Sequence, residues 1–183
     1  MAIKTFTTGE VLTSTDTNTY LTNAGLVYIK QQTIGTGVPS VTVPSAFTPT
    51  YDNYQVIYEM GDGSNPAAAM LVTFNNSAGA TYSYGGIYVT YGTATVTAET
   101  ANNVTNGIRV GNENAGLSSI VFEIISPYKT TPTHVVAQHA DQEYWSTRGG
   151  RDSNVVSHTG FTLTPSAGTL TGGTIYVYGY RKA

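Results

Sequence analysis

Carboxyl groups are the first residues to consider for chemistry, because glycan hydrolysis needs two of them at a set separation across the scissile bond. The chain has 11 acidic residues. Asp141 and Glu143 form the only close pair, and their spacing would place both on one face of a strand. Most of the others stand in predicted turns or at strand ends. We therefore expect solvated loop charges at these positions, this pair included, and no catalytic pair.

Other catalytic motifs are also missing. No G-x-S-x-G turn is present to expose a serine nucleophile. The Gly-Gly pairs at 149–150 and 172–173 do not open helices, so we expect them in turns and not at phosphate-binding sites. The sequence therefore predicts a protein that is not an enzyme.

The histidines do not form a local metal site. His134 and His139 are five positions apart, so on one strand they would face opposite sides, and His158 is remote in sequence. Residues 62–65 (Asp-Gly-Ser-Asn) offer oxygen ligands as a calcium loop does, but no downstream glutamate completes the set. We expect a plain turn there, and neither a metal nor a cofactor. An ion held by equivalent residues at a threefold axis stays open as an alternative.

Aromatic residues suggest a binding surface instead. An exposed aromatic ring flanked by Asn, Asp and Arg commonly stacks on a sugar ring, and Trp145 is the only tryptophan. Tyr82, Tyr84 and Tyr88 share one face of a regular strand, unless Gly85-Gly86 introduces a bulge. The favoured reading is that these rings fill the core or a subunit interface. The alternative is a glycan-contact set that consists of Tyr82, Tyr84, Trp145, Arg148 and Asp152.

Composition indicates the fold class and excludes several partners. Charged residues are 10% of the chain, whereas an ordinary domain has about 25%, and Thr, Tyr and Gly are abundant. Thr and Tyr favour strands and Gly favours turns, so the chain is predicted to be all-β. The net charge is -3 and the eight Lys and Arg do not cluster, which argues against nucleic-acid binding. No apolar run is long enough to insert into a membrane, and no secretory signal is expected. Cysteine is absent, so stability must come from packing or assembly.

Short runs of strand-forming residues separated by turn signals fill the chain from residue 26 onward. Residues 117–125 are the most apolar run and the best core candidate, and 99–103 are predicted to be a loop. This pattern predicts one domain at 25–183, a single antiparallel β-sandwich of the jelly-roll type. The predicted strands are 26–32, 40–43, 54–60, 69–74, 82–91, 93–98, 107–110, 117–125, 133–139, 144–147, 154–158, 160–164 and 173–180.

Residues 1–24 are predicted to form a docking arm. Side chains at 13–16 suit a helix cap and Gly25 suits a helix end, so a short helix is expected at about 15–23. The arm would dock on its own domain or on a neighbouring subunit. Its apolar residues Leu12, Tyr20 and Leu21 are the candidate contacts.

The final predicted strand has two uncharged faces. Ile175, Val177 and Gly179 share one face. The other face carries Thr174 and the candidate interface residues Tyr176, Tyr178 and Tyr180. We expect both faces to be covered, the second of them by another subunit.

Several phrases in a fixed order resemble a family of bacteriophage tail and minor structural proteins. Residues 6–21 (FTTGEVLTSTDTNTYL) are similar to the family's opening phrase, F-x-x-G-x-V-L-T-A-x-D-x-N-x-Y-L, and 25–35 continue it. The segments 47–56 (FTPTYDNYQV), 122–128 (FEIISPY) and 160–181 (GFTLTPSAGTLTGGTIYVYGYR) resemble later phrases. The resemblance implies a virion component, often trimeric, without catalytic residues.

Together these expectations describe a non-enzymatic phage structural protein, a tail or tail-fibre component made in the host bacterial cytoplasm. It would form a homotrimer and contact other virion proteins through its arm. Two alternatives stay open: a carbohydrate-binding module that attaches to a bacterial surface glycan, and a decoration (cement) protein of the capsid head.

Overall fold

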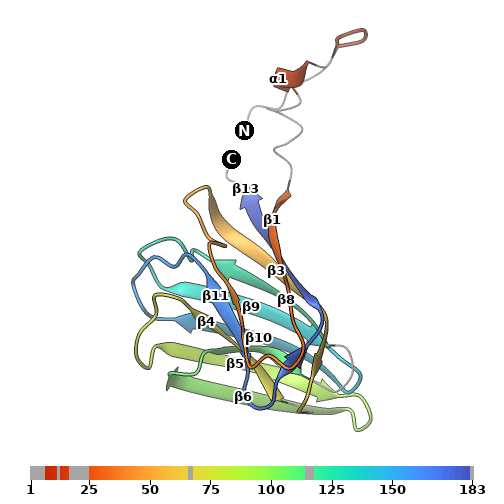
Figure 1. The fold of residues 1–183 in the computed structure, drawn as a ribbon, viewed down its shortest axis with the longest axis vertical. Helices are drawn as coiled ribbons and strands as arrows, with labels where there is room; N and C mark the ends of the chain where they lie inside the picture. Colours follow the sequence, from red (N-terminus) through yellow and green to blue (C-terminus); the bar gives the residue numbers. More distant parts are fainter. Residues whose placement is uncertain (1–6, 12, 17–24, 66–67, 114–117, 182–183) are drawn as a thin grey trace.

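The computed structural model describes residues 7–11, 13–16, 25–65, 68–113 and 118–181. These residues form two antiparallel β-sheets that pack face to face, which confirms the all-β sandwich (Figure 1). No helix in this part of the chain is long and apolar enough to cross a membrane. Of the helix predicted at 15–23, only the start is described: Ser14–Asp16 form a single turn, α1. The arm helix therefore stays a prediction.

The strands follow one another with short connections. In chain order they are β1 (Leu26–Thr33), β2 (Val41–Val43), β3 (Tyr51–Gly63), β4 (Ala68–Phe74), β5 (Tyr82–Thr90), β6 (Thr95–Val104), β7 (Ile108–Glu113), β8 (Ser118–Ile125), β9 (Thr133–Ala140), β10 (Tyr144–Asp152), β11 (Phe161–Pro165), β12 (Leu170–Thr171) and β13 (Thr174–Arg181).

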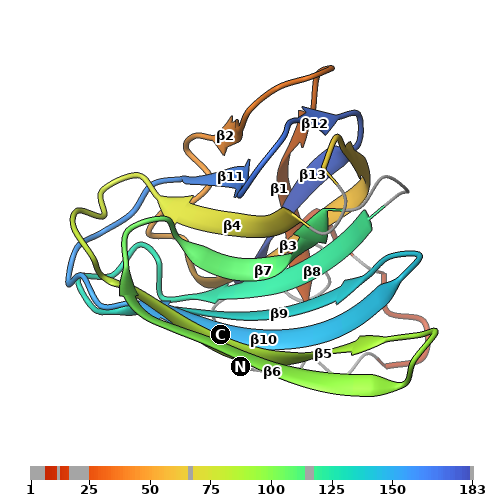
Figure 2. The ribbon, with the colours of Figure 1, turned by 90° about the horizontal axis from the view of Figure 1, so that it is seen from below.

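The two sheets differ in width. The large sheet has the order β1-β13-β3-β8-β9-β10-β5-β6, with β12 paired to β3, and the small sheet has the order β2-β11-β4-β7. Figure 2 shows the small sheet on one side of the molecule and β8, β9, β10, β5 and β6 on the other. The small sheet ends at β7, so β5 and β6 extend beyond it.

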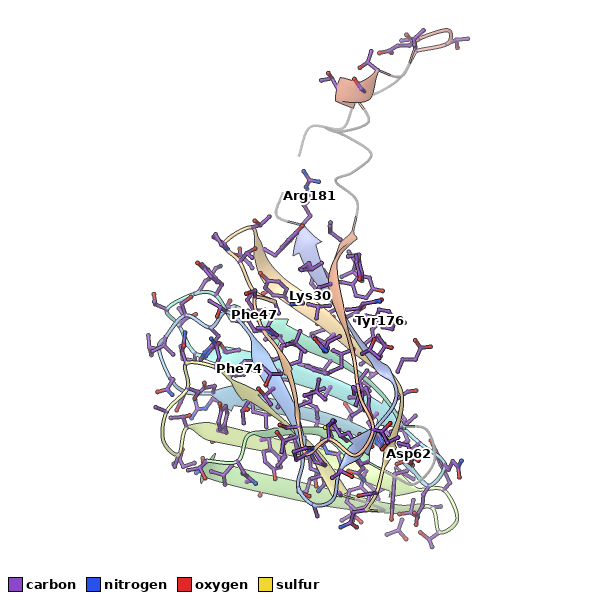
Figure 3. The ribbon with its side chains drawn as sticks, viewed as in Figure 1. Lys30, Phe47, Asp62, Phe74, Tyr176 and Arg181 are labelled. Carbon is purple, nitrogen blue, oxygen red and sulfur yellow. The ribbon has the colours of Figure 1, made fainter. Side chains whose placement is uncertain are left out.

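The core lies between the sheets and is built by strand alternation. In β8, Ile120, Phe122 and Ile124 point inward and are buried, as expected for the most apolar run. Phe47 links the layers: its ring centroid is 4.8 Å from that of Tyr54 on β3 of the large sheet and 6.3 Å from that of Phe74 on β4 of the small sheet (Figure 3). Aromatic pairs at such distances stabilise a core beyond the area that they bury.

Three local predictions are wrong, for physical reasons. Residues 99–103 are not a loop but part of β6, an edge strand whose polar outward side chains gave it a loop-like composition. Residues 149–150 are not a turn but lie inside β10, in regular register with β5 and β9. Residues 154–158 are not a strand, because the N–H of Asn154 bonds to the Asp152 carboxylate (3.1 Å) and turns the chain.

The turn between β6 and β7 sets the position of β7. Gly107 has φ +114°, a conformation that L side chains rarely adopt, and a Cβ built there would lie 2.6 Å from the carbonyl oxygen of Val72 on β4. Because β7 must lie against β4 to complete the small sheet, this position has room only for glycine.

We predict that Gly107→Ala lowers the free energy of unfolding by about 2 kcal/mol or more, through backbone strain and the contact with Val72. Gly92→Ala is the control, because this exposed turn glycine has nothing within 4 Å of its Cβ position, and the change should stay within about 0.5 kcal/mol. Urea unfolding followed by circular dichroism measures both. Equal stability of the two variants would contradict the proposed constraint.

Candidate functional site

The face of the large sheet that points away from the small sheet, here called the outer face, is the first candidate surface. It exposes Ile87 (38%), Val121 (39%), Val136 (49%) and Trp145 (38%). The pairing register aligns Val121, Gln138, Thr147 and Ile87 in one row across β8, β9, β10 and β5. Scattered exposed apolar residues are ordinary, but these lie on adjacent strands of one surface.

The rows on either side of this one are also nearly uncharged. The first is Glu123, Val136, Gly149 and Gly85, and the second is Ser119, Ala140, Trp145 and Val89. Glu123 is the single charged residue of the three rows, and its Oε1 accepts a 2.6 Å hydrogen bond from the Tyr180 hydroxyl. The centre of the outer face can therefore approach another molecule without strong charge repulsion.

The tyrosines of β13 extend the outer face toward β1. Tyr176, Tyr178 and Tyr180 are half-buried there, while Ile175, Val177 and Gly179 are buried inward, in the alternation expected. The ring of Tyr178 meets the exposed ring of Tyr28 edge to face, with centroids 5.9 Å apart. Tyr176 lies at the edge of the molecule in Figure 3, away from Phe47 and Phe74. The other three candidate contacts, Leu12, Tyr20 and Leu21, lie outside the described residues.

The five candidate glycan contacts do not form one exposed platform. Trp145 is on the outer face, whereas Tyr82, Tyr84, Arg148 and Asp152 point inward, and three of these four are fully buried. The reason is strand parity, because residues 145 and 148 are an odd number of positions apart on β10. The predicted common face of Tyr82, Tyr84 and Tyr88 is confirmed as the inner face, and the pairing of Gly85-Gly86 is regular.

Asp152 holds the loop that follows β10. Its Oδ2 lies 3.3 Å from Nε2 of His158, both side chains are fully buried, and the His158 ring stacks on Phe74 with centroids 4.9 Å apart. Burial lowers the pKa of His158, although the Asp152 carboxylate opposes this effect. The pair fixes loop 153–159 against the sandwich and is not accessible to a ligand.

A cluster of charged side chains closes the flank where β6 extends past the small sheet. The Glu99 carboxylate accepts hydrogen bonds from Arg109 Nη1 (2.5 Å) and from Arg148 Nε. Asn112 Oδ1 accepts from Nη2 of Arg109 (2.6 Å) and of Arg148 (3.3 Å). Burial lowers the pKa of Arg148, but Glu99 favours its charged form. One acid thus compensates two guanidinium groups contributed by β7 and β10.

A chain of polar groups continues from this cluster along the inner face. Arg148 Nη1 donates to Ser146 Oγ, which lies 3.3 Å from His139 Nδ1, and His139 Nε2 lies 3.2 Å from Asp141 Oδ2. The order Asp-His-Ser is that of a serine hydrolase. A nucleophile must reach its substrate, however, and Ser146 is 0% exposed. We assign these groups a structural role.

Asp141 is not the solvated loop charge that we expected. Its side chain is fully buried, and Oδ1 accepts hydrogen bonds from the backbone N–H groups of Glu143 (2.7 Å) and Tyr144 (2.6 Å). Burial alone would raise its pKa, but His139 and these N–H groups lower it below the ordinary value. Asp141 therefore shapes the β9–β10 turn, while Glu143 is exposed.

A pocket of about 280 Å³ opens beside the charged cluster. Tyr88 and Tyr144 form one wall, with their rings nearly perpendicular and centroids 5.8 Å apart. Glu99, Arg109 and Asn112 form another wall. Because these groups are already paired with one another, the pocket offers a ligand little free charge.

Glu113 on β7 is a buried carboxyl that lies beside the buried hydroxyl of Tyr58. This hydroxyl opposes the effect of burial on the pKa of Glu113, although the atoms of the two groups do not reach good hydrogen-bond geometry with any described residue. Burial raises the pKa of Glu113 to about 7 and raises the pKa of Tyr58 above its ordinary value. Glu113 therefore costs stability when it ionises.

The histidines separate as their spacing predicted. His134 is exposed on the outer face of β9 and His139 is buried on the inner face. Within the described ranges, no three His, Cys, Asp or Glu side chains come close enough to hold a metal ion.

Sequence reasoning missed most of the inner polar residues. Glu99, Arg109, Asn112 and Ser146 come from three strands that only the fold brings together. One signal was available: Ser146 and Arg148 share a strand face, as do His139 and Asp141 if β9 is extended by one residue.

No protein-family model matches the chain, and a search of curated proteins gives no significant match.

We predict that the Glu99→Gln variant loses on the order of 2–4 kcal/mol of stability, because buried Arg148 then has no counter-charge. The double variant Glu99→Gln with Arg148→Met should recover part of this loss, since it removes the more deeply buried of the two arginines that lose their carboxylate partner. Urea unfolding at neutral pH compares the two. A single variant as stable as the parent would show that the cluster does not stabilise the flank.

We predict that the parent protein loses stability relative to the Glu113→Gln variant as pH rises from about 5 to 8, because Glu113 has a folded pKa of about 7 against an ordinary value of 4.5. The folded state then holds a proton that the unfolded state has released, so unfolding becomes easier as pH rises. Relative to Glu113→Gln, the loss should reach at most about 3 kcal/mol. Unfolding at several pH values measures it, and Glu59→Gln, at an exposed position, is the control. The same pH slope in parent and Glu113→Gln would refute the assignment.

Proposed function

We propose that the chain is a non-enzymatic structural protein of a bacteriophage particle, a tail or tail-fibre component that assembles as a homotrimer. The observation that supports assembly is the nearly uncharged centre of the outer face, which exposes Ile87, Val121, Val136 and Trp145. The virion assignment is supported by the resemblance of residues 6–21 and 160–181 to phage structural proteins.

An architectural role agrees with the chemistry of the interior. The charged groups of the interior pair with one another. Glu99 pairs with Arg109 and Arg148, and His139 pairs with Asp141. They close the flank of the sandwich and shape a turn. Such a domain acts through its shape and through repeated contacts in an assembly.

The connection to other virion proteins is proposed at the end of the sandwich where β1 begins. Leu26 pairs with Tyr180 there, so the start of β1 and the end of β13 lie side by side (Figure 1). The segment before residue 25 continues from this end, which makes it a suitable tether to a neighbouring virion protein.

Attachment to a bacterial surface glycan is the second candidate, and Trp145 favours it. This ring borders a hollow of about 210 Å³ together with Gln138 and Ser119. An aromatic ring beside an amide and a hydroxyl suits a sugar, which offers both an apolar face and hydroxyl groups.

We expect the purified full chain to have the mass of three 19.4 kDa chains by light scattering coupled to size-exclusion chromatography. Immunoblots of separated tails and tailless capsids should detect it in the tail fraction. Detection with the capsids alone would identify a head decoration protein, and absence from particles would reject the virion role.

Trp145→Ala separates the two candidate roles. If the outer face is an interface, the variant should assemble poorly. If the face binds glycan, assembly should be normal and adsorption to host cells should be lost. Val155→Ala, at an exposed loop position, is the control in both measurements.

A further inference from the structure

Two Gly-Gly pairs lie beside each other in the middle of the large sheet. Gly85-Gly86 belongs to β5 and Gly149-Gly150 belongs to β10. Gly85 pairs directly with Gly149 across the two strands. Because successive residues of a strand point to opposite faces, each pair has one inward and one outward glycine.

The inward glycines are explained by the packing of this chain. A Cβ at Gly86 would lie 2.4 Å from the carbonyl oxygen of Thr147, and a Cβ at Gly150 would lie 2.5 Å from Cγ2 of Ile108 on β7. Side chains do not fit at such distances. The close approach of β10 within the large sheet requires Gly86, and the approach of the small sheet at β7 requires Gly150.

The outward glycines are not explained in this way. The nearest atom to a Cβ at Gly85 would be 3.5 Å away, and at Gly149 it would be 3.8 Å away, which are ordinary contact distances. Neither residue has a positive φ. Glycine weakens a strand relative to alanine, and it marks places where another backbone or a ligand approaches closely. The isolated chain gives neither glycine a reason to be there.

The outward glycines form the floor of a hollow on the outer face. Its volume is about 330 Å³, and its walls are Ile87, Val136 and Thr147. A second hollow of about 290 Å³ lies on the same face around Val121 and Gln138. Exposed apolar side chains thus surround a trough without side chains, here called the glycine trough.

Charge and area both favour a second copy of the chain as the occupant. The three central rows carry one charged residue, Glu123, already bonded to Tyr180, so two copies of this face do not repel each other. Nucleic acid would need a basic surface, and the chain has a net charge of -3. The three rows span four strands about 4.8 Å apart and cover on the order of 400 Å². The whole outer face, which has eight strands about seven residues long and also carries Arg151, covers on the order of 800 Å². That equals one partner's share of a standard interface, about 800 Å².

We infer that the outer face packs against another copy of this chain, and that the glycine trough receives an apolar side chain of that copy. The inference deepens the proposed homotrimer and depends on its assembly. It assigns the contact to the centre of the large sheet, at Gly85, Gly149, Val136 and Ile87.

The test fills the trough without disturbing the monomer. Gly149→Thr adds a β-branched side chain with room at its Cβ, and Gly92→Thr, in the exposed β5–β6 turn, is the matched control. Sedimentation of the full chain over a concentration series should show self-association roughly 10- to 100-fold weaker for Gly149→Thr and unchanged for Gly92→Thr. Circular dichroism should show the same fold in all three proteins.

Val136→Lys gives a second, independent perturbation, because it adds a charge at an exposed position of the same face and should also dissociate the assembly. The inference is overturned if Gly149→Thr and Val136→Lys both associate as the parent does. It is also overturned if the parent is monomeric at all concentrations. Normal association with lost host-cell adsorption also overturns it and identifies a bacterial glycan as the occupant. An oligomer that is absent from phage particles rejects the proposed virion role and leaves the interface supported.

Discussion

The unequal width of the two sheets is the constraint on which the rest of this structure depends. The large sheet has nine strands, counting the short β12, and the small sheet has four. A sheet must cover its apolar face, and the small sheet does this only over part of the large one. Where the small sheet covers the large one, the core is aromatic and aliphatic, and the Phe161 ring contacts both Phe47 and Phe122. In the part of the chain that the structure describes, no further strand of the small sheet lies beyond β7.

Where the small sheet does not cover the large one, paired polar side chains occupy much of the inner face. Past β7 the inward residues become Glu99, Arg148 and Ser146, and β7 supplies Arg109 and Asn112 to meet them. Glu99, Arg109 and Arg148 keep their charges at this partly buried flank because they form ion pairs with one another. The same principle explains Asp141, whose buried carboxylate bonds to the N–H groups of its own turn.

The alternation of side chains along β10 places structural residues on its inner face and the candidate interface residues on its outer face. On β10, Ser146, Arg148 and Gly150 serve the interior, while Trp145, Thr147 and Gly149 form part of the outer face. The interior residues are explained by contacts within the chain. The outer residues Trp145, Thr147 and Gly149 carry no charge although they face solvent, and the charged Arg151 follows them only at the end of the strand. This contrast within a single strand is one reason why we propose assembly.

The sequence by itself determined the β class, most strand positions and the two-sided final strand, because alternation and turn residues act locally. It also contained the parity that separates Trp145 from Arg148. Only the tertiary structure decided that 95–104 is one edge strand, since its polar composition suits both a loop and a solvated edge. The pairing of β10 with β5 likewise decided that Gly149 meets Gly85, and the packing of β7 decided that Glu99 meets two arginines. These contacts join residues far apart in the chain, and their register depends on the whole sheet, which no local pattern encodes.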